Sequence, residues 1–265
     1  MEQINKINGK SVALSSFLDL DSKVLISDES VIYLKNTTDV SGDSEITFEL
    51  DVNAKLDLTI FDFSLAATAH QNLNFNLQEN SSLKMVYVCL NSGTTKNQIT
   101  ANLNGQQAQA DINVISVANH GVNTEFDVVC NNNAPFTNGN ITQRAVALSG
   151  GQNIFNATGY IGKDCSKAVN FQESRALLLD GAAKGDASPI LLINHHDVEA
   201  GHAAGVSRVN DDEMYYLMSR GIDRKSAEQL MTVAFIRPVV DKITDLDLRE
   251  SVFDKIREKA SYEID

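Results

Sequence analysis

The sequence predicts a mainly β protein that ends in a small α-helical domain. Short runs of alternating apolar and polar residues fill most of the chain, as expected of strands with one buried face. Clusters rich in Asn, Gly, Ser and Asp separate these runs at intervals of roughly 10 to 16 residues and predict turns. After about Asp211 the apolar residues recur at helical spacing instead. We therefore divide the chain into a β core, residues 1–208, and a C-terminal helical domain, residues 209–265.

The β core is expected to consist of many short strands without helices between them. The clearest runs cover residues 31–34, 46–50, 56–61, 72–77, 83–90, 99–103, 110–116, 124–129, 141–148 and 154–160. Such spacing fits a sandwich, a barrel or a solenoid. Asn residues crowd beside the runs, and stacked Asn side chains hydrogen-bond along ladders of parallel strands. This favours a solenoid modestly, but the pattern alone leaves sandwich and solenoid open.

The first helix is expected to start at Asp211 and Asp212, which can cap it, and to end before Gly221. Its apolar residues are Met214, Leu217 and Met218. They fall on one face at helical spacing and are expected to be helix core.

A second helix is expected to open at Asp223, and Pro238 is expected to kink or end it. Its apolar face consists of Ala227, Leu230, Met231, Ala234 and Phe235. A last amphipathic segment follows around residues 248–257. We interpret all these apolar positions as helix core.

Composition excludes several classes of function. The chain has 22 Lys and Arg residues against 35 Asp and Glu residues, a formal net charge of −13, so we expect no nucleic-acid binding. No stretch approaches the roughly 20 apolar residues that span a bilayer, so no membrane span is expected. The polar N-terminus lacks a secretory signal, and three widely spaced cysteines are typical of reduced thiols. We therefore expect a cytoplasmic protein.

Ligand-type residues gather between His195 and His202, where three histidines and two carboxylates occur within eight residues. Imidazole binds iron, zinc and copper, so a transition-metal site is one interpretation. The other is a solvated polar stretch that follows a buried strand at residues 189–193. If the segment is extended, His195 and His196 point to opposite faces.

Several landmarks occur in a recognisable order between about residue 150 and residue 240. They are Leu177–Leu179, Pro189–Leu191, Asp197–Val198, His202–Ala204, Asp212–Ile222, Ala227, Leu230 and Ala234–Phe235. This stretch resembles the SufB/SufD family of iron–sulfur cluster assembly subunits. The resemblance implies a right-handed parallel β-helix followed by a helical domain, which favours the solenoid over the sandwich.

The resemblance also implies partners. Family members pair through their β-helices, as SufB–SufD heterodimers or as homodimers, and their C-terminal helices dock the ABC-type ATPase SufC. We therefore expect a scaffold subunit and not an enzyme. The helical residues expected to contact a partner are Tyr216, Arg220, Gly221, Ala227 and Phe235.

Two positions make the chain resemble SufD rather than SufB. SufB carries a cysteine before the leucine triplet and another after it, where this chain has Ser174 and Ala183. His202 falls where SufD subunits carry a histidine proposed to act at the dimer interface. The resemblance therefore implies His202 as an iron ligand, with no stably bound cofactor and at most a transient iron–sulfur cluster at the interface.

The three cysteines are expected to differ. Cys89 and Cys130 end apolar runs and are expected to be buried thiols. Cys165 lies in a polar turn, so we expect it to be the more reactive one. It does not fall at the family's cluster position.

Two other functions are weighed against the SufD-like scaffold. One is a homodimeric SufB-like subunit that itself holds the nascent cluster, through Cys165 or His202. The other is a carbohydrate-active β-helix enzyme, which needs paired carboxylates flanking the scissile bond. The sequence offers no convincing pair.

Overall fold

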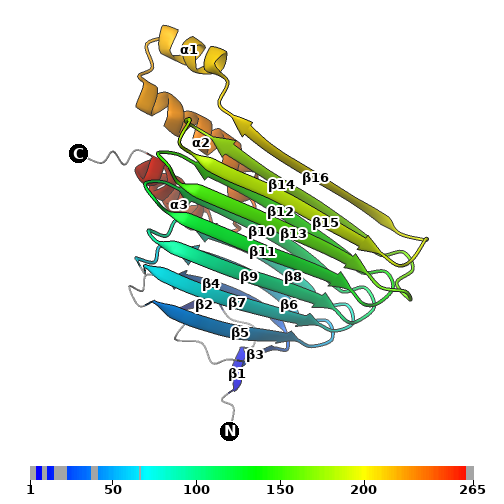
Figure 1. Cartoon of the computed structure of the whole chain (residues 1–265). Coiled ribbons are helices and arrows are strands. Elements are labelled where there is room, and N and C mark those ends of the chain that lie inside the picture. Colours follow the sequence, from blue (N-terminus) through cyan, green and yellow to red (C-terminus); the bar gives the residue numbers. More distant parts are fainter. Residues whose placement is uncertain (1–3, 8–10, 15–22, 37–40, 66, 261–265) are drawn as a thin grey trace.

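In the computed structural model, the described residues (4–7, 11–14, 23–36, 41–65 and 67–260) form a parallel β-solenoid followed by three helices (Figure 1). The chain alternates between two sheets of eight strands each, and every strand pairs in parallel with the strand two positions away in sequence. The predicted parallel β-helix with a helical C-terminal part is confirmed, and the sandwich is excluded.

The odd-numbered strands form one sheet, called sheet A, and the even-numbered strands form sheet B. Sheet A contains β1 (Ile4–Ile7), β3 (Lys23–Ile26), β5 (Gly42–Leu50), β7 (Thr68–Leu77), β9 (Thr94–Leu103), β11 (Asn123–Asn132), β13 (Gln152–Ile161) and β15 (Lys184–Ile193). Sheet B contains β2 (Ser11–Leu14), β4 (Glu29–Asn36), β6 (Lys55–Asp62), β8 (Ser82–Cys89), β10 (Gln109–Ala118), β12 (Asn138–Ala147), β14 (Val169–Leu178) and β16 (Glu199–Arg208).

Aromatic side chains stack inside the solenoid along its axis. The Phe48 and Phe75 rings lie parallel, with centroids 4.9 Å apart. The Phe126 ring makes edge contacts with Tyr87 at 5.1 Å and with Phe155 at 5.8 Å. All five side chains are fully buried. Because parallel strands stack in register, residues at one inward position of successive turns become neighbours.

Asn side chains form the ladder that the sequence predicts. On the outer face of sheet A, Asn102 Nδ2 donates to Asn76 Oδ1 at 3.0 Å, and Asn131 Nδ2 donates to Asn102 Oδ1 at 2.9 Å. Each side-chain amide thus donates a hydrogen bond to the amide oxygen of the preceding turn. This favours exact register between turns.

One corner of the solenoid repeats a left-handed backbone conformation. The residues at this corner are Asn53, Asn80, Gln107, Phe136 and Lys167, with φ between 57° and 64°. Each of their N–H groups donates to a carbonyl of the following turn, ending with Lys167 on Asp197 at 2.7 Å. These bonds satisfy backbone donors that a corner would otherwise leave unpaired.

The helices are α1 (Asp211–Ser219), α2 (Arg224–Val240) and α3 (Leu246–Ala260). Asp223 caps α2 as predicted, since its side chain accepts from Ser226 N at 2.9 Å. The cap of α1 is Asn210 and not Asp211 or Asp212, because only the Asn210 oxygen accepts a first-turn N–H, that of Asp212. Pro238 does not end α2 at its own position, and the helix continues to Val240.

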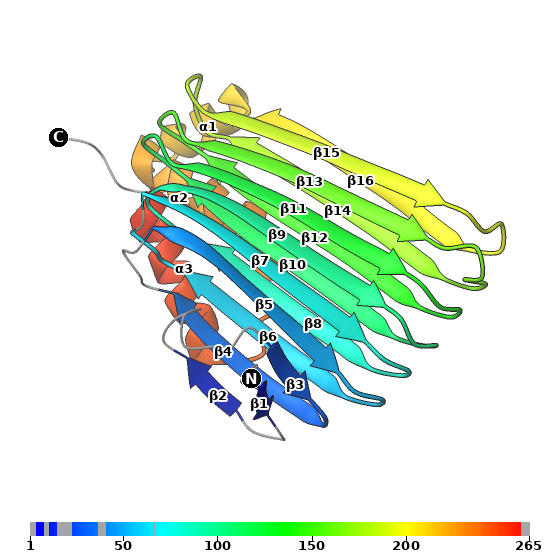
Figure 2. The ribbon, with the colours of Figure 1, turned by 60° about the horizontal axis from the view of Figure 1, so that its bottom comes forward.

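Helices α2 and α3 cover the outer face of sheet B near the carboxyl ends of its strands (Figure 2). The shared core contains Phe61, Val86, Val88, Leu90, Ile115, Val117, Val146, Leu148, Leu177, Leu179, Ile236, Val239, Val240, Ile243, Val252, Phe253 and Ile256. The strands end at Arg208 and the helices begin at Asp211. Within the described residues, none of the three helices is long and apolar enough to cross a membrane.

Candidate functional site

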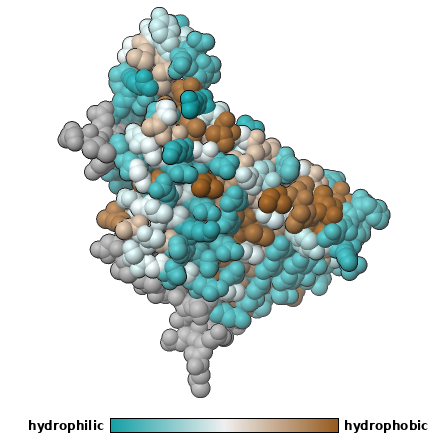
Figure 3. Space-filling model, viewed as in Figure 1, coloured by the Kyte–Doolittle hydropathy of each residue, from teal (hydrophilic) through white to brown (hydrophobic). Residues whose placement is uncertain are grey.

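The solenoid has an open end at its last turn, formed by β15 and β16. Among the described strands, each of these two has a partner on one side only, so each is an edge strand. The side chains of Ile190, Leu192 and Ile193 are about half exposed, at 50%, 51% and 46%. The prediction of a buried strand at residues 189–193 is therefore wrong, because no further turn covers β15. Apolar surface is visible at this end of the molecule in Figure 3.

The open edge of β16 carries unpaired backbone groups. Glu199 N and Val209 N donate to Ala168 and Leu178 of the preceding turn, each at 3.0 Å. Since backbone groups of a strand alternate between its two sides, the N–H groups of even-numbered residues such as His202 and Ala204 point to the open edge. An edge of this kind is a template for another strand.

His202 stands at an inward-facing position of this last turn. It is in register with Gln172 of β14, which is buried, while His202 itself is exposed. Gln172 Nε2 donates to Ile190 O at 3.1 Å, whereas its Oε1 is buried without a hydrogen-bond partner in the described part of the chain. The imidazole thus lies where the interior of the solenoid opens to solvent.

The other two histidines lie elsewhere, in the turn between β15 and β16. The His195 and His196 rings are stacked, with centroids 4.9 Å apart and planes 8° apart, and the condition for opposite faces, an extended segment, is not met. The reason is that this segment is a turn and not an extended strand. The described residues contain no group of three or more metal-ligating side chains placed to hold an ion, so the three histidines do not form one site.

An ion pair links the turn between β15 and β16 to the preceding turn of the solenoid. Lys167 Nζ bonds Asp197 Oδ1 at 2.7 Å, and this contact lowers the pKa of the Asp197 carboxyl. His195 Nδ1 accepts the Asp197 N–H at 3.1 Å. The Nδ1 atom of His195 is therefore engaged in a hydrogen bond within the turn.

Ser174 and Ala183 are both buried. The Ser174 hydroxyl donates to Gln143 Oε1 at 2.5 Å. Ala183 packs in a small apolar cluster with Ala147 and Leu178, and its N–H donates to Asp180 Oδ1 at 2.9 Å. Neither position offers a metal ligand at the surface.

All three cysteine thiols are free and buried. Cys165 is not exposed in its polar turn, because its side chain is only 1% exposed and its Sγ donates to Asn132 O at 3.0 Å. That it is the more reactive of the three thiols stays a prediction. Burial raises the pKa of the Cys165 thiol, raises that of Cys130 to about 12, and raises that of Cys89 further.

We expect the native thiols to resist alkylation at pH 8. The thiolate is the reactive form, and a pKa raised by burial depletes it. Labelling of Cys130 by iodoacetamide should be at least about 100-fold slower in the folded protein than in urea. Mass spectrometry of the labelled peptides checks this, and equal rates in both states would contradict it.

A second exposed apolar surface lies on the first two helices. Its most exposed large side chains are Tyr215 at 75%, Tyr216 at 56%, Leu230 at 53% and Met218 at 45%. A shallow cavity of about 410 Å³ opens beside it, lined by Asp212, Glu213, Tyr216, Leu217 and Met231. Met218 and Leu230 are therefore not core as predicted, because α1 packs through Met214 and α2 packs through Ala227, Thr232, Ile236, Val239 and Val240.

The five predicted partner-binding residues lie in different environments. The Arg220 guanidinium lies over the Tyr216 ring at 5.2 Å, and Gly221 follows α1 with a φ of 86°. Ala227 is fully buried and has no surface to offer a partner. Phe235 is half-buried, and the Arg144 guanidinium carbon lies 5.9 Å from the centroid of the Phe235 ring. The structure thus places Tyr216, Arg220 and Gly221 at the exposed surface of the helices.

Comparison with known proteins assigns most of the chain to one family. The sequence model described as "SUF system FeS cluster assembly, SufBD core domain" matches residues 26–235. The chain is 36% identical over 179 residues to the Bacillus subtilis iron–sulfur cluster assembly protein SufD, covering 68% of this chain and 41% of that protein.

More distant relatives give the same picture. A SufBD family protein of Staphylococcus epidermidis is 26% identical over 167 residues, covering 63% of this chain and 36% of the relative. One of Mycobacterium tuberculosis is 26% identical over 141 residues, covering 53% of this chain and 17% of the relative. The matched part thus spans less than half the length of each relative.

Proposed function

The chain belongs to the SufB/SufD family of the SUF iron–sulfur cluster assembly system, and we propose that it is a SufD-like scaffold subunit that performs no catalysis itself. The observation that carries this proposal is the uncovered last turn, which gives a scaffold its pairing surface. The compartment in which it would work is the cytoplasm.

Pairing would use the edges of β15 and β16. An exposed edge strand with half-exposed apolar side chains is a liability unless another chain covers it. A second parallel solenoid, either SufB or another copy of this chain, would supply matching edge strands and continue both sheets. The proposed mode is strand addition, in which main-chain hydrogen bonds hold the pair and side chains select the partner.

The nascent iron–sulfur cluster is cargo in this scheme, and His202 is proposed as a ligand to iron at the interface. Its exposed side chain on the open turn is compatible with this role. Ser174, Ala183 and the buried thiols favour the SufD-like assignment over a subunit that holds the cluster through its own cysteines. Loss of iron from the assembled pair in a His202→Ala variant is the measurement that decides this point.

SufC would dock on the surface formed by Tyr215, Tyr216, Met218 and Leu230. Aromatic side chains with a neighbouring Arg are the usual anchors of protein interfaces. The acidic first turn of α1, with Asp211, Asp212 and Glu213, adds charge that favours a basic partner face.

We expect Tyr216→Ala to weaken SufC binding by about 10- to 100-fold, the effect of removing an interface anchor worth about 2 kcal/mol. The matched control is Leu246→Ala, which removes an apolar side chain of similar exposure, 67%, at the start of α3. Titration calorimetry of purified chain with SufC measures both. SufC binding that survives deletion of the residues after Asp211 would overturn the docking proposal.

A further inference from the structure

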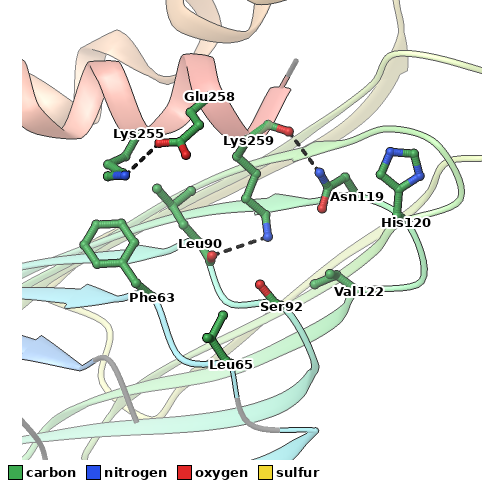
Figure 4. Close-up of a pocket in the computed structure, with 10 residues that line it drawn as sticks. All are labelled: Phe63, Leu65, Leu90, Ser92, Asn119, His120, Val122, Lys255, Glu258 and Lys259. Atoms are coloured by element: carbon green, nitrogen blue, oxygen red, sulfur yellow. Dashed lines mark hydrogen bonds and ion pairs between the residues drawn. The ribbon is translucent and has the colours of Figure 1, made fainter. Parts of the chain in front are cut away.

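A cavity of about 370 Å³ lies between the last turn of α3 and three turns of the solenoid (Figure 4). Its apolar wall is formed by Phe63, Leu65, Leu90 and Val122. The α3 side contributes Lys255, Glu258 and Lys259, and the remaining lining residues are Ser92, Asn119 and His120. The cavity is remote from the strands of the open end and from α1.

Lys259 is held tightly in this wall. Its Nζ donates to the backbone carbonyls of Leu90, at 3.3 Å, and Asn91. Its own backbone carbonyl accepts from Asn119 Nδ2 at 2.9 Å, which fixes the end of α3. The neighbouring Lys255 behaves differently, because its ammonium pairs with Glu258 at 2.7 Å.

The environment of Lys259 increases the fraction of neutral amine relative to a solvent-exposed lysine. Burial lowers the pKa of Lys259 to about 8, although the nearby Cys89 and Asp62 raise it in part. A neutral amine has two N–H bonds and one lone pair. The Nζ atom contacts the carbonyls of Leu90 and Asn91, and the Lys259 side chain also lines the cavity.

We propose that Lys259 is a nucleophilic lysine and that the cavity beside it captures apolar aldehydes as imines. The geometry supplies both requirements, a largely buried amine in the lining of a cavity and an apolar wall for the chain of the aldehyde. Lysines activated by desolvation in apolar pockets form Schiff bases with carbonyl substrates in this way.

The reaction needs only the aldehyde. The Nζ lone pair forms a bond to the carbonyl carbon, and the carbonyl π electrons move to oxygen. The proton lost by nitrogen passes through water to that oxygen and gives a carbinolamine. Loss of water then forms the carbon–nitrogen double bond of the imine, with no change of oxidation state overall.

The test exposes the full chain to hexanal with sodium cyanoborohydride, which reduces any imine to a stable amine, and maps the modified lysines by peptide mass spectrometry. We expect Lys259 to be modified at least about 10-fold faster than Lys255 at pH 7.5, with a rate that rises with pH and levels off above about pH 8. Equal modification of the two lysines, or a rate at Lys259 that still rises steeply above pH 9, would overturn the proposal.

Two variants complete the test. Lys259→Arg keeps a cation beside the carbonyls and should remove the fast modification, whereas Lys255→Arg should leave it unchanged. The rates at Lys259 and Lys255 are compared within the parent protein, which carries no substitution. This comparison therefore holds even if a variant folds poorly. Fast modification that persists elsewhere in Lys259→Arg would show that another amine is responsible.

Discussion

An Ala204→Asp variant is expected to pair at least about 100-fold more weakly than the parent chain with its partner at the open end. Ala204 is in register with the buried Ser174, so its side chain faces the interior of the last turn. In an end-to-end pair this position would be enclosed between two turns. An unpaired carboxylate there costs about 3 kcal/mol or more, equivalent to about 100-fold in affinity.

The adjacent Ala203 is the matched control. It is the same residue type, is also exposed, and faces the outer side of sheet B, because side chains alternate along a strand. Ala203→Asp should leave pairing within about threefold of the parent. Sedimentation velocity with SufB and with the chain alone measures both variants, and equal losses from the two would argue against pairing through the last turn.

Asp62→Ala is expected to lower the free energy of unfolding by about 3–5 kcal/mol, among the largest effects of a single substitution in this chain. The Asp62 carboxylate is fully buried and accepts from Asn36 Nδ2 and Ser64 N, each at 3.0 Å. It also accepts from Tyr87 OH at 3.2 Å and Gln71 Nε2 at 3.3 Å. Removing it takes away the acceptor that these four buried donors share, although the Tyr87 hydroxyl keeps its contacts with Gln71 Oε1 and Asn97 Oδ1.

Urea denaturation measures this loss, and Tyr87→Phe is the control. The phenol supplies one of the four bonds to Asp62 and also contacts Gln71 Oε1 and Asn97 Oδ1. Its removal leaves the carboxylate with three donors, so it should cost about 1 kcal/mol. Comparable losses from the two substitutions would contradict the central role of Asp62.

The same carboxyl gives a pH signature. Burial raises the pKa of Asp62, against the lowering effect of its hydrogen bonds, so the folded state holds its proton more tightly than the unfolded state. Stability from this group is therefore largest at acid pH and declines as pH rises through the raised pKa. The stability difference between the parent and Asp62→Ala should be larger near pH 4 than at pH 7.

Much of the fold could be predicted from the sequence because the pattern is local. Alternation marked which residues of a strand face inward, as in residues 124–129, and Asn crowding indicated the stack of Asn76, Asn102 and Asn131. The choice of a solenoid over a sandwich required the family resemblance, because both folds bury alternate residues of short strands.

The sequence does not reveal at which strand the solenoid ends or which turn residues are buried by the neighbouring turns. The apolar run at residues 189–193 reads as a buried strand, since nothing in its own composition reveals that no strand follows on its far side. Cys165 lies in a polar stretch of sequence, yet Ile161 and Ala168 pack with it, and Val198 and Ala200 of the next turn pack against this cluster. Both properties depend on residues far away in sequence or on their absence.

The histidines show the same limit at the candidate site. Spacing placed His195, His196 and His202 in one cluster, but the turn before β16 separates the stacked pair from the strand residue. The burial and contacts of Lys259 could not be predicted from the sequence, because its carbonyl partners at Leu90 and Asn91 lie over 160 positions away.

The packing of α2 and α3 across sheet B has a consequence for how the molecule unfolds. In a plain solenoid each turn contacts only its neighbours, so turns can fray from either end nearly independently. Here one apolar layer joins side chains of β6, β8, β10 and β12, together with Leu177 of β14, to the same two helices. The two helices therefore hold these turns together. The turns beneath them should exchange their amide hydrogens as one cooperative unit, while the edge strands β15 and β16 open first.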